Sequence, residues 1–600
     1  MAPDDLAREI QLLRASWASG DRMDPAFRHD CGARLAALRA VFRDRPQAFS
    51  RDVVQALRAI ADGLRAPDPE TVRRVLKATF GFDSFRPGQE PIVAAVLSGR
   101  DCVGVMPTGA GKSLTYQLPA RILGGTTLVI SPLIALMKDQ VDAMAEAGLR
   151  ATFLNSSLAP DERRRRVDGL RAGAYELVYA APEGLEASVG GALGSVRLTM
   201  IAVDEAHCIS QWGHDFRPAY RNLAGLKGRF GGIPVLALTA TATVEVTRDI
   251  VSQLGMMNPA QVRGSFFRPN LCIHAYRKGG AEALPAREAV LRLCAARRGQ
   301  SGIVYCLARK SVDAMAELLR DGGISARPYH AGMEPEDRAE AQEAFRRDEV
   351  DVIVATVAFG MGIDKPDVRY VIHRDMPRSI EGYYQEIGRA GRDGMPSDCV
   401  LFYSWADVMS YDRFDGDAPP EVAERNRRQT REMFDLADGR ACRHRALVRY
   451  LGEAVDTCGR GCDVCAGLDV VGQAPALGGG RRRRRRSDGD AAVPVDASDV
   501  RPARPRREET DATHDGLFER LRALRRQLAD ARRLPAYVIF SDACLHEIAE
   551  RRPLTADQLL EISGIGPKKL AAYGDEILAV VSSWSSSPSS SARSAAPFGE

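Results

Sequence analysis

The stretch CVGVMPTGAGKS, residues 102–113, decides the fold of the chain around it. A short apolar run, typical of a buried strand, leads into a glycine-rich loop, and a helical pattern follows. Gly109 and Gly111 allow successive backbone N–H groups to surround a phosphate at the start of that helix. A strict phosphate loop has glycine at position 106, where this chain has Met106. The stretch therefore predicts a phosphate site, with a chance glycine-rich turn as the alternative.

Each polar group of this loop has a predicted task in binding ATP. Lys112 is expected to reach the β and γ phosphates, and the Ser113 hydroxyl is expected to hold Mg²⁺. The residues predicted to contact the nucleotide are Thr108, Gly109, Ala110, Gly111, Lys112 and Ser113.

Apolar, β-branched runs recur downstream of the loop and alternate with helical patterns. The first series is CVGVM, TTLVIS, LVYAAP, TMIAVDE and IPVLALTAT, and the second is SGIVYC, DVIVAT and RYVIH. Strands that alternate with helices in this way form parallel sheets. The sequence therefore predicts an α/β protein with two tandem parallel-sheet domains.

Two acidic residues, Asp204 and Glu205, end the run TMIAVDE about 90 residues after the loop, where a phosphoryl-transfer site has a magnesium-holding acid and a water-polarising acid. We expect Asp204 to bind Mg²⁺ through its water shell and Glu205 to orient the attacking water. A solvated strand end is the alternative.

Two arginines in QEIGRAGRDG, residues 385–394, are candidates to complete the site from the second domain. Arg389 and Arg392 are one helical turn apart, so both guanidinium groups are expected on one face of a helix. Arginine suits a bidentate grip on phosphate oxygens. Supplied across a cleft, it raises phosphoryl-transfer rates by about 10³ to 10⁵. A surface pair of salt bridges is the alternative.

Four of the 12 cysteines lie close together in the spacing C-x15-C-x3-C-x2-C. Four soft thiolates in a reduced protein predict a closed, tetrahedral and structural Zn²⁺ site. Buried thiols without a metal are the alternative. The predicted ligands are Cys442, Cys458, Cys462 and Cys465.

The composition is that of an ordinary globular protein, with a net charge of +4 and no run of 18 apolar residues. The acidic start does not resemble a signal peptide, so a cytoplasmic protein without membrane association is expected. The expected segments are a helical extension (1–70), two α/β domains (71–275 and 276–405), a helical zinc-binding subdomain (406–468), a disordered Arg-rich linker (469–513), a small helical domain (514–581) and a disordered tail (582–600).

Several blocks of sequence, taken in order, resemble the RecQ family of DNA helicases, in helicase superfamily 2, over most of residues 72–466. Residues 517–578 also resemble the helicase-and-RNase-D C-terminal (HRDC) domain. The blocks are FGFDSFRPGQ (80–89), MPTGAGKS (106–113), SPLIALMKDQV (131–141), VDEAHCISQWGHDFRP (203–218), LTATAT (238–243), ATVAFGMGIDKPDVRYVIH (355–373) and EGYYQEIGRAGRDG (381–394).

The resemblance implies two RecA-like domains that hydrolyse ATP and move 3′ to 5′ on single-stranded DNA. Single-stranded and tailed duplex DNA are the implied substrates, and the implied location is the nucleoid if the source is bacterial. Repair or single-strand-binding proteins are possible partners. The expected oligomeric state is a monomer. It also implies the zinc subdomain, although the family's middle cysteine spacer is two residues rather than three.

Further site residues follow from the same resemblance. Phe82 is implied to stack on adenine and Gln89 to read its edge, with Arg86 nearby, unless this is an ordinary packed loop. Gly362 and Asp364 are implied to approach the ribose and phosphates from the second domain.

An aromatic and cationic loop follows the acidic pair directly. Trp212, His214, Phe216, Arg217 and Tyr220 offer stacking faces and a charge, a mixture that favours single-stranded bases by about 1 to 3 kcal/mol per stacked base. Because this loop begins so close to Glu205, DNA bound there is expected to stimulate ATP hydrolysis. Aromatic side chains packed under the strand are the alternative.

Family members often carry a winged-helix domain after the zinc subdomain, and the chain here is too short for one. Its linker holds ten arginines against six acidic residues over 481–510, so it either contacts phosphates or is simply solvated. The turn in ISGIGPKKLAAYG, residues 562–574, with Lys568 and Lys569 beside it, is either a phosphate cradle or a structural turn.

Two other functions remain open: an RNA helicase, and a DNA-binding ATPase scaffold with little unwinding.

Overall fold

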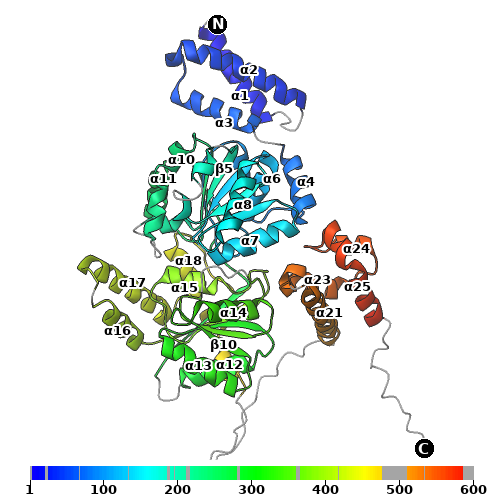
Figure 1. The fold of residues 1–600 in the computed structure, drawn as a ribbon. Helices are drawn as coiled ribbons and strands as arrows, with labels where there is room; N and C mark the ends of the chain where they lie inside the picture. The colour runs from blue at the N-terminus through cyan, green and yellow to red at the C-terminus, as the bar shows by residue number, and fades with distance from the viewer. Residues whose placement is uncertain are drawn as a thin grey trace, which may run out of the picture.

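The computed structural model describes twelve stretches of the chain. They are residues 3–19, 25–65, 68–132, 134–185, 190–194, 196–210, 217–279, 284–359, 365–416, 418–475, 510–532 and 534–585. Two parallel sheets, one above the other in Figure 1, form its centre, with a helical module beyond the first sheet and another beside the junction of the two.

The first sheet has seven parallel strands in the order β3-β4-β2-β5-β6-β1-β7. The strands are β1 (Cys102–Val105), β2 (Thr126–Ile130), β3 (Ala151–Leu154), β4 (Leu177–Ala180), β5 (Leu198–Val203), β6 (Val235–Thr239) and β7 (Ala260–Arg263). The helices of this domain are α4 (Pro69–Phe80), α5 (Gln89–Leu97), α6 (Leu114–Leu123), α7 (Ile134–Glu146), α8 (Pro160–Arg171), α9 (Gly190–Leu193), η3 (Ala206–Ile209), η4 (Pro218–Leu223), α10 (Leu226–Arg229) and α11 (Val244–Leu254).

The second sheet has six parallel strands in the order β10-β11-β9-β12-β13-β8. They are β8 (Leu271–Arg277), β9 (Ser301–Tyr305), β10 (Ala326–Tyr329), β11 (Val352–Ala355), β12 (Val368–His373) and β13 (Ser397–Tyr403). Its helices are α12 (Ala286–Ala295), α13 (Arg309–Asp321), α14 (Pro335–Arg346) and α15 (Ile380–Ile387).

The predicted fold class, two tandem parallel-sheet domains, is confirmed, and every predicted strand is present. Five strands were not predicted: β3, β7, β8, β10 and β13. Four of them lie at sheet edges, where part of each strand faces solvent and the continuous apolar run of a central strand is lost.

The zinc-binding subdomain packs on the edge strand β8. The Ile273 N–H donates to the Gly461 carbonyl at 2.9 Å, and the Ala275 N–H donates to an Asp463 carboxylate oxygen at 3.1 Å. Its helices are α16 (Trp405–Phe414), α17 (Pro420–Asp438), α18 (Arg443–Tyr450), α19 (Asp463–Ala466) and α20 (Val470–Gln473). Because the Val470 N–H donates to the Tyr276 hydroxyl at 2.9 Å, the first residues of the predicted disordered linker are instead ordered against β8. Residues 476–509, including the run of six arginines, lie outside the described residues.

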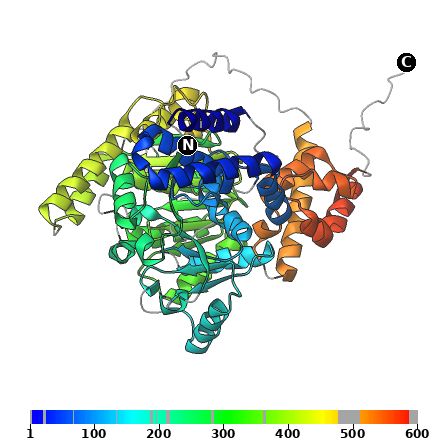
Figure 2. The ribbon, with the colours of Figure 1, turned by 90° about the horizontal axis from the view of Figure 1, so that it is seen from above.

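The C-terminal helical domain touches both sheet domains, beside their junction in Figure 1 and to one side in Figure 2. Gly566 contacts Gly81, since a Cβ on Gly81 would lie 3.6 Å from the Gly566 nitrogen, an ordinary van der Waals distance. On the second domain, an Arg522 guanidinium nitrogen donates to the Gly299 carbonyl at 2.5 Å. The helices are α21 (Thr510–Arg532), α22 (Ala536–Ile539), α23 (Asp542–Arg551), α24 (Ala556–Leu560) and α25 (Pro567–Ser585).

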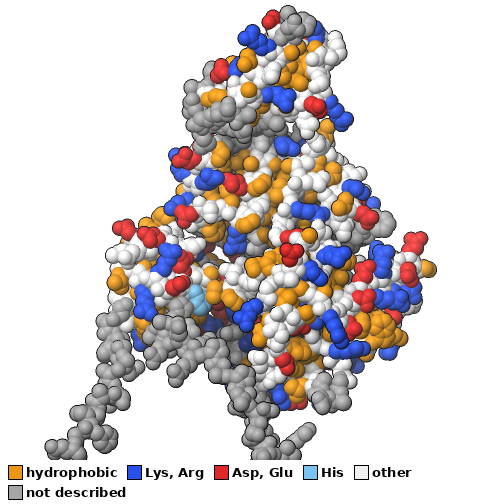
Figure 3. Space-filling model, turned by 180° about the vertical axis from the view of Figure 1, so that it is seen from behind, with side chains coloured by type: hydrophobic (Ala, Val, Ile, Leu, Met, Phe, Trp, Pro, Cys, Tyr) orange, Lys and Arg blue, Asp and Glu red, His pale blue; other side chains and the backbone are white. Residues whose placement is uncertain are grey.

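The N-terminal module has a core of its own. Its helices are α1 (Pro3–Ser19), α2 (Pro25–Asp44), η1 (Pro46–Ala48) and α3 (Arg51–Arg65). Leu6, Ile10, Leu13 and Trp17 form one apolar face of α1, and this face is buried in a core shared with α2 and α3. Over the face of the molecule in Figure 3, acidic and basic side chains are interspersed, in keeping with the small net charge. Within the described helices, none is both long and apolar enough to cross a membrane.

Candidate active site

The predicted phosphate loop lies between β1 and α6, at the carboxyl edge of the first sheet. Gly109 and Gly111 have φ values of +83° and +75°, in the left-handed region where glycine is favoured over residues with a Cβ. The Lys112 ammonium group donates to the Met106 carbonyl at 3.3 Å. The loop therefore has the backbone that a phosphate cradle requires, although position 106 carries methionine.

Gln89 and Arg86 hold this loop from the N-terminal side. The Gln89 amide nitrogen donates to the carbonyls of Ala110 and Gly111 at 3.1 and 2.9 Å, and its oxygen accepts from the Arg86 N–H at 2.8 Å. An Arg86 guanidinium nitrogen donates to the Gly109 carbonyl at 2.7 Å. Here the Gln89 side chain supports the loop, so its reading of adenine stays a prediction. Phe82, 39% exposed, presents a ring that a base can cover.

Asp204 and Glu205 follow β5 at the same edge of the sheet. One Asp204 carboxylate oxygen accepts from the Glu205 N–H at 3.0 Å, and Glu205 has a φ of +46°, which is rare for a residue other than glycine. Tyr116 hydrogen-bonds to the Ser113 side chain and also lies in the field of Asp204. Burial, reinforced by that carboxylate, raises the pKa of Tyr116 well above its usual value. The predicted magnesium-binding residues Ser113 and Asp204 therefore both lie near one tyrosine.

His207 links the acidic pair to the end of β6, a connection that was not predicted. Its Nδ1 lies 2.8 Å from the Thr239 hydroxyl and 3.3 Å from a Glu205 carboxylate oxygen. The Thr239 hydroxyl in turn donates to the Thr241 carbonyl at 3.0 Å. The signal was present in LTATAT, where paired threonines end a buried strand.

The aromatic loop is only partly described. Trp212, His214 and Phe216 lie outside the described residues. The Arg217 N–H donates to the Cys208 carbonyl at 3.0 Å, and an Arg217 guanidinium nitrogen donates to the Pro132 carbonyl at 3.3 Å. The base of the loop is therefore fixed to the segment that follows Glu205.

The prediction that Tyr220 presents a stacking face is wrong. Its side chain is 0% exposed, and its hydroxyl donates to the Asp204 carbonyl at 2.9 Å. The ring belongs to the core because η4 packs against η3 and α11. Tyr220 therefore fixes the position of the acidic pair.

The second domain brings its arginines to the site on turns rather than on a helix. Helix α15 ends at Ile387, and Gly391 has a φ of +55°, so the predicted common helical face of Arg389 and Arg392 is wrong. A Cβ on Gly109 would lie 3.3 Å from the Cγ of Arg392, which places Arg392 at the phosphate loop.

Arg389 is 8% exposed and lies inside the second domain. It lines a cavity of about 500 Å³ together with Tyr305, His373 and Glu386. Burial, opposed by the charge of Arg389, raises the pKa of Tyr305 to about 12. Gly362 and Asp364 lie outside the described residues.

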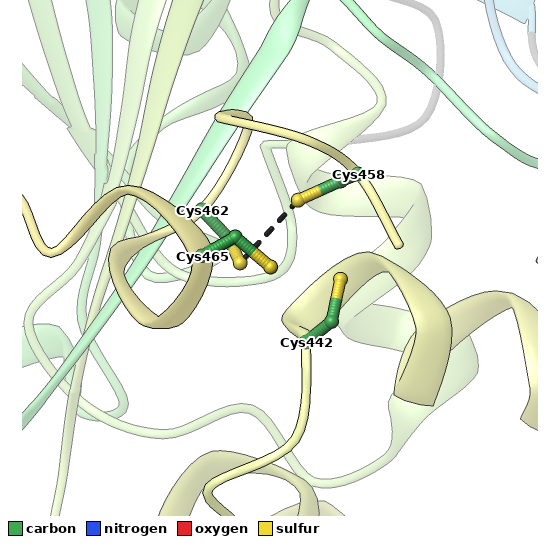
Figure 4. Close-up of side chains that lie close together, drawn as sticks. All are labelled: Cys442, Cys458, Cys462 and Cys465. Atoms are coloured by element: carbon green, nitrogen blue, oxygen red, sulfur yellow. Dashed lines mark hydrogen bonds between the residues drawn. The ribbon is translucent and has the colours of Figure 1, made fainter. Parts of the chain in front are cut away.

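The four predicted zinc ligands come together, with their side chains directed toward one another (Figure 4). Their sulfur atoms all lie within 4.8 Å of one another, and those of Cys458 and Cys462 are 3.4 Å apart. Zn–S bonds of about 2.3 Å in a tetrahedron require sulfur separations of about 3.8 Å, so the cluster fits Zn²⁺. Burial opposes ionisation of Cys442, but backbone hydrogen bonds from Arg445 and Cys458 lower the pKa of its thiol to about 7.

Comparison with known proteins gives matches along most of the chain. Four family models match: DEAD/DEAH box helicase at residues 86–250, Helicase conserved C-terminal domain at 286–394, RecQ zinc-binding at 405–466 and HRDC domain at 514–581. The ATP-dependent DNA helicase RecQ of Pasteurella multocida is 36% identical over 86% of this chain and 94% of its own length. Proteins of the same name from Haemophilus influenzae and Bacillus subtilis are each 37% identical, over 85% and 82% of this chain and 96% and 95% of theirs.

Two RecA-like domains, with a phosphate loop on one and arginines on the other, define a helicase-type ATPase. A zinc subdomain and an HRDC domain complete the architecture. The chain belongs to the RecQ family and is an ATP-dependent DNA helicase that binds zinc.

Replacing Lys112 with alanine is expected to abolish ATP turnover and leave DNA binding largely intact, because the ammonium group bonds within the phosphate loop, to the Met106 carbonyl. Steady-state ATPase rates and fluorescence anisotropy with labelled single-stranded DNA measure the two properties. Lys77→Ala, an exposed lysine of α4, is the control and should hydrolyse ATP normally. Equal ATPase rates in Lys112→Ala and the wild type would refute the phosphate assignment.

Replacing Cys442 with serine is expected to lower the zinc content well below one ion per chain, because three thiolates hold Zn²⁺ more weakly than four. Elemental analysis of the purified protein measures the content. Cys272→Ser is the matched control, since Cys272 is a half-buried thiol of β8 outside the cluster. A Cys442→Ser protein that retains one zinc per chain would contradict the ligand set.

Proposed function

We propose that this helicase moves 3′ to 5′ along single-stranded DNA and couples each ATP hydrolysed to DNA held by residues 211–217. The supporting observation is how the C-terminal end of that segment is attached to the residues around the acidic pair. Arg217 is bonded to the Cys208 carbonyl, and Tyr220 is bonded to the carbonyl of Asp204. A shift of the loop on binding DNA is therefore transmitted to the acidic pair over a few bonds.

In this proposal, Lys112 binds the β and γ phosphates, and Glu205 orients the attacking water. His207 Nδ1 lies between the Glu205 carboxylate, at 3.3 Å, and the Thr239 hydroxyl at the end of β6, at 2.8 Å. Ser113 and Asp204 offer the oxygen ligands that Mg²⁺ prefers, and a bound Mg²⁺ neutralises charge on the phosphates.

On the opposite side of the cleft, we assign the phosphate-contacting role first to Arg392, because it lies against Gly109. Arg389 lines the cavity inside the second domain, and Gly388 directly before it lies against Thr108 of the phosphate loop, so its phosphate contact stays a prediction. Phe82 and Gln89 remain the proposed adenine contacts, with Arg86 beside them, and Gly362 and Asp364 the proposed ribose and phosphate contacts.

The proposed DNA contacts are Trp212, His214, Phe216 and Arg217. In the C-terminal domain, only one of the two candidate lysines suits a phosphate. Lys569 donates to the Val538 carbonyl at 3.2 Å, and burial lowers its pKa, whereas Lys568 is exposed. We propose the segment boundaries expected from the sequence with two changes: the zinc-binding subdomain extends through α20 to Gln473, and the C-terminal domain begins with α21 at Thr510. We also propose a monomeric state and a cytoplasmic, nucleoid-associated location.

The direction of movement is tested with duplex DNA that carries a single-stranded tail at one end. Strand displacement is expected with a 3′ tail and ATP, and to be at least tenfold slower with a 5′ tail. ATPase measurements with single-stranded DNA and RNA should show stronger stimulation by DNA. Stimulation by DNA without any displacement would favour an ATPase scaffold, and stronger stimulation by RNA would contradict the DNA assignment.

Replacing Trp212 with alanine is expected to remove most of the stimulation of ATP hydrolysis by DNA and to leave the rate without DNA unchanged. The loss of one stacked base corresponds to about 1 to 3 kcal/mol of DNA binding. ATPase rates should therefore be measured over a range of DNA concentrations that reaches saturation. Trp405→Ala, an exposed tryptophan of α16, is the control. Full stimulation at saturating DNA in Trp212→Ala would exclude the loop as the coupling element.

A further inference from the structure

The connector between the two sheet domains, residues 264–270, is fixed at its start by the zinc-binding subdomain. Glu453 accepts hydrogen bonds from the Phe266 N–H and the Ser265 hydroxyl, each at 2.5 Å. One Arg263 guanidinium nitrogen donates to the Leu451 carbonyl at 3.3 Å and the other donates to the Ala242 carbonyl at 2.9 Å. The zinc-binding subdomain therefore determines where the second half of the connector begins.

The second half of the connector carries Arg268, whose guanidinium group spans the cleft between the domains. One terminal nitrogen donates to the Thr108 carbonyl of the phosphate loop at 2.9 Å. The other donates to the carbonyls of Ala390 and Gly391, in the turn before Arg392, at 3.0 and 2.7 Å. The Arg268 Nε donates to the Asn270 side-chain oxygen at 3.2 Å, which orients the group.

A guanidinium group suits this position because its N–H donors diverge in one rigid plane. It can therefore bond to carbonyls on both sides of a cleft at once, whereas a lysine ammonium group is a single point of charge. Gly109 permits the approach, since a Cβ there would lie 3.3 Å from both Arg268 Nη1 and Arg392 Cγ.

The electrostatic surroundings of Arg268 also favour an anion nearby. Burial is the main cause that lowers its pKa, and the charges of Arg392 and Arg86 act in the same direction. Among the described residues, no carboxylate lies within ion-pair distance of Arg268. Its charge therefore adds to a cationic region that faces the phosphate loop.

We propose that Arg268 is a positioning residue for ATP hydrolysis, because it fixes the distance between the phosphate loop and the turn that carries Arg392. It acts through Arg392 rather than by holding the nucleotide itself. This proposal rests on the assignment of Lys112 and Arg392 to the nucleotide site. Misplacement of a catalytic group by about 1 Å can cost about 10²-fold in rate, so loss of the bridge should reduce kcat more than nucleotide affinity.

The test compares Arg268→Lys and Arg268→Met with the wild-type protein. In both variants, kcat for DNA-stimulated ATP hydrolysis is expected to fall by about 10- to 100-fold, and the Kd for a fluorescent ADP analogue to change by less than about threefold. Arg277→Met is the matched control, an exposed arginine at the end of the strand that follows the connector. It should keep the wild-type kcat.

Two results would overturn the proposal. A wild-type kcat in Arg268→Lys would show that charge alone is sufficient, and a Kd that rises as much as kcat falls would show direct binding or general damage to the fold. Asn270→Asp keeps the oxygen that accepts from Arg268 Nε but removes the amide nitrogen that donates to the Gly391 and Met395 carbonyls at 2.9 and 3.0 Å. It should reduce kcat less than Arg268→Met, and a loss of kcat as large as that of Arg268→Met would overturn the role of Arg268 as the main bridge.

A double-mutant cycle separates this proposal from the site assignment on which it rests. If Arg268 acts through Arg392, the double variant with Arg268→Met and Arg392→Met should be no slower than Arg392→Met alone. Multiplied effects would show that the two residues act independently, which overturns the positioning role. A wild-type rate in Arg392→Met itself would instead show that the assignment of Arg392 is wrong.

Discussion

The parallel pairing of β6 with β1 on one side and with β5 on the other is the constraint on which the rest of the structure depends. Parallel strands end at the same edge of their sheet, so the loops that follow them meet there. The phosphate loop, the acidic pair and the threonines at the end of β6 are far apart in the sequence. The pairing of these strands brings them together in space. The hydrogen bond from Met106 N–H to the Thr239 carbonyl is a direct sign of that convergence.

Residues that belong to a local pattern could be predicted from the sequence. The glycines and lysine of the phosphate loop, the acids at a strand end and the four closely spaced cysteines each form such a pattern, because their chemistry depends on short-range spacing. Arg268 has no such pattern, since it bonds to Thr108, 160 residues before it, and to Gly391, 123 residues after it. Tyr220 was misassigned because an aromatic ring gives the same signal in a core as in a binding loop. The helical spacing of Arg389 and Arg392 failed because Gly391 adopts a left-handed backbone conformation between them.

The zinc-binding subdomain does more than stabilise its own short helices. Arg443, next to the ligand Cys442, forms a two-bond ion pair with Asp463 and donates to three carbonyls near the end of α17. Helix α18 then leads to Leu451 and Glu453, which hold the connector. A structural metal is therefore linked through one short helix to the segment that joins the two ATP-binding halves. The subdomain therefore contacts the connector that carries Arg268, and through it the turn that carries Arg392.

The contact between Gly566 and Gly81 has a mechanical consequence, because the same small domain also bonds to Gly299 on the other half of the motor. Because the C-terminal domain contacts both sheet domains, one of its two contacts must break if the sheet domains move apart. The C-terminal domain would then move together with one half. The contact at Gly81 directly precedes Phe82, the proposed adenine contact, so the C-terminal domain meets the first sheet domain beside the proposed nucleotide site.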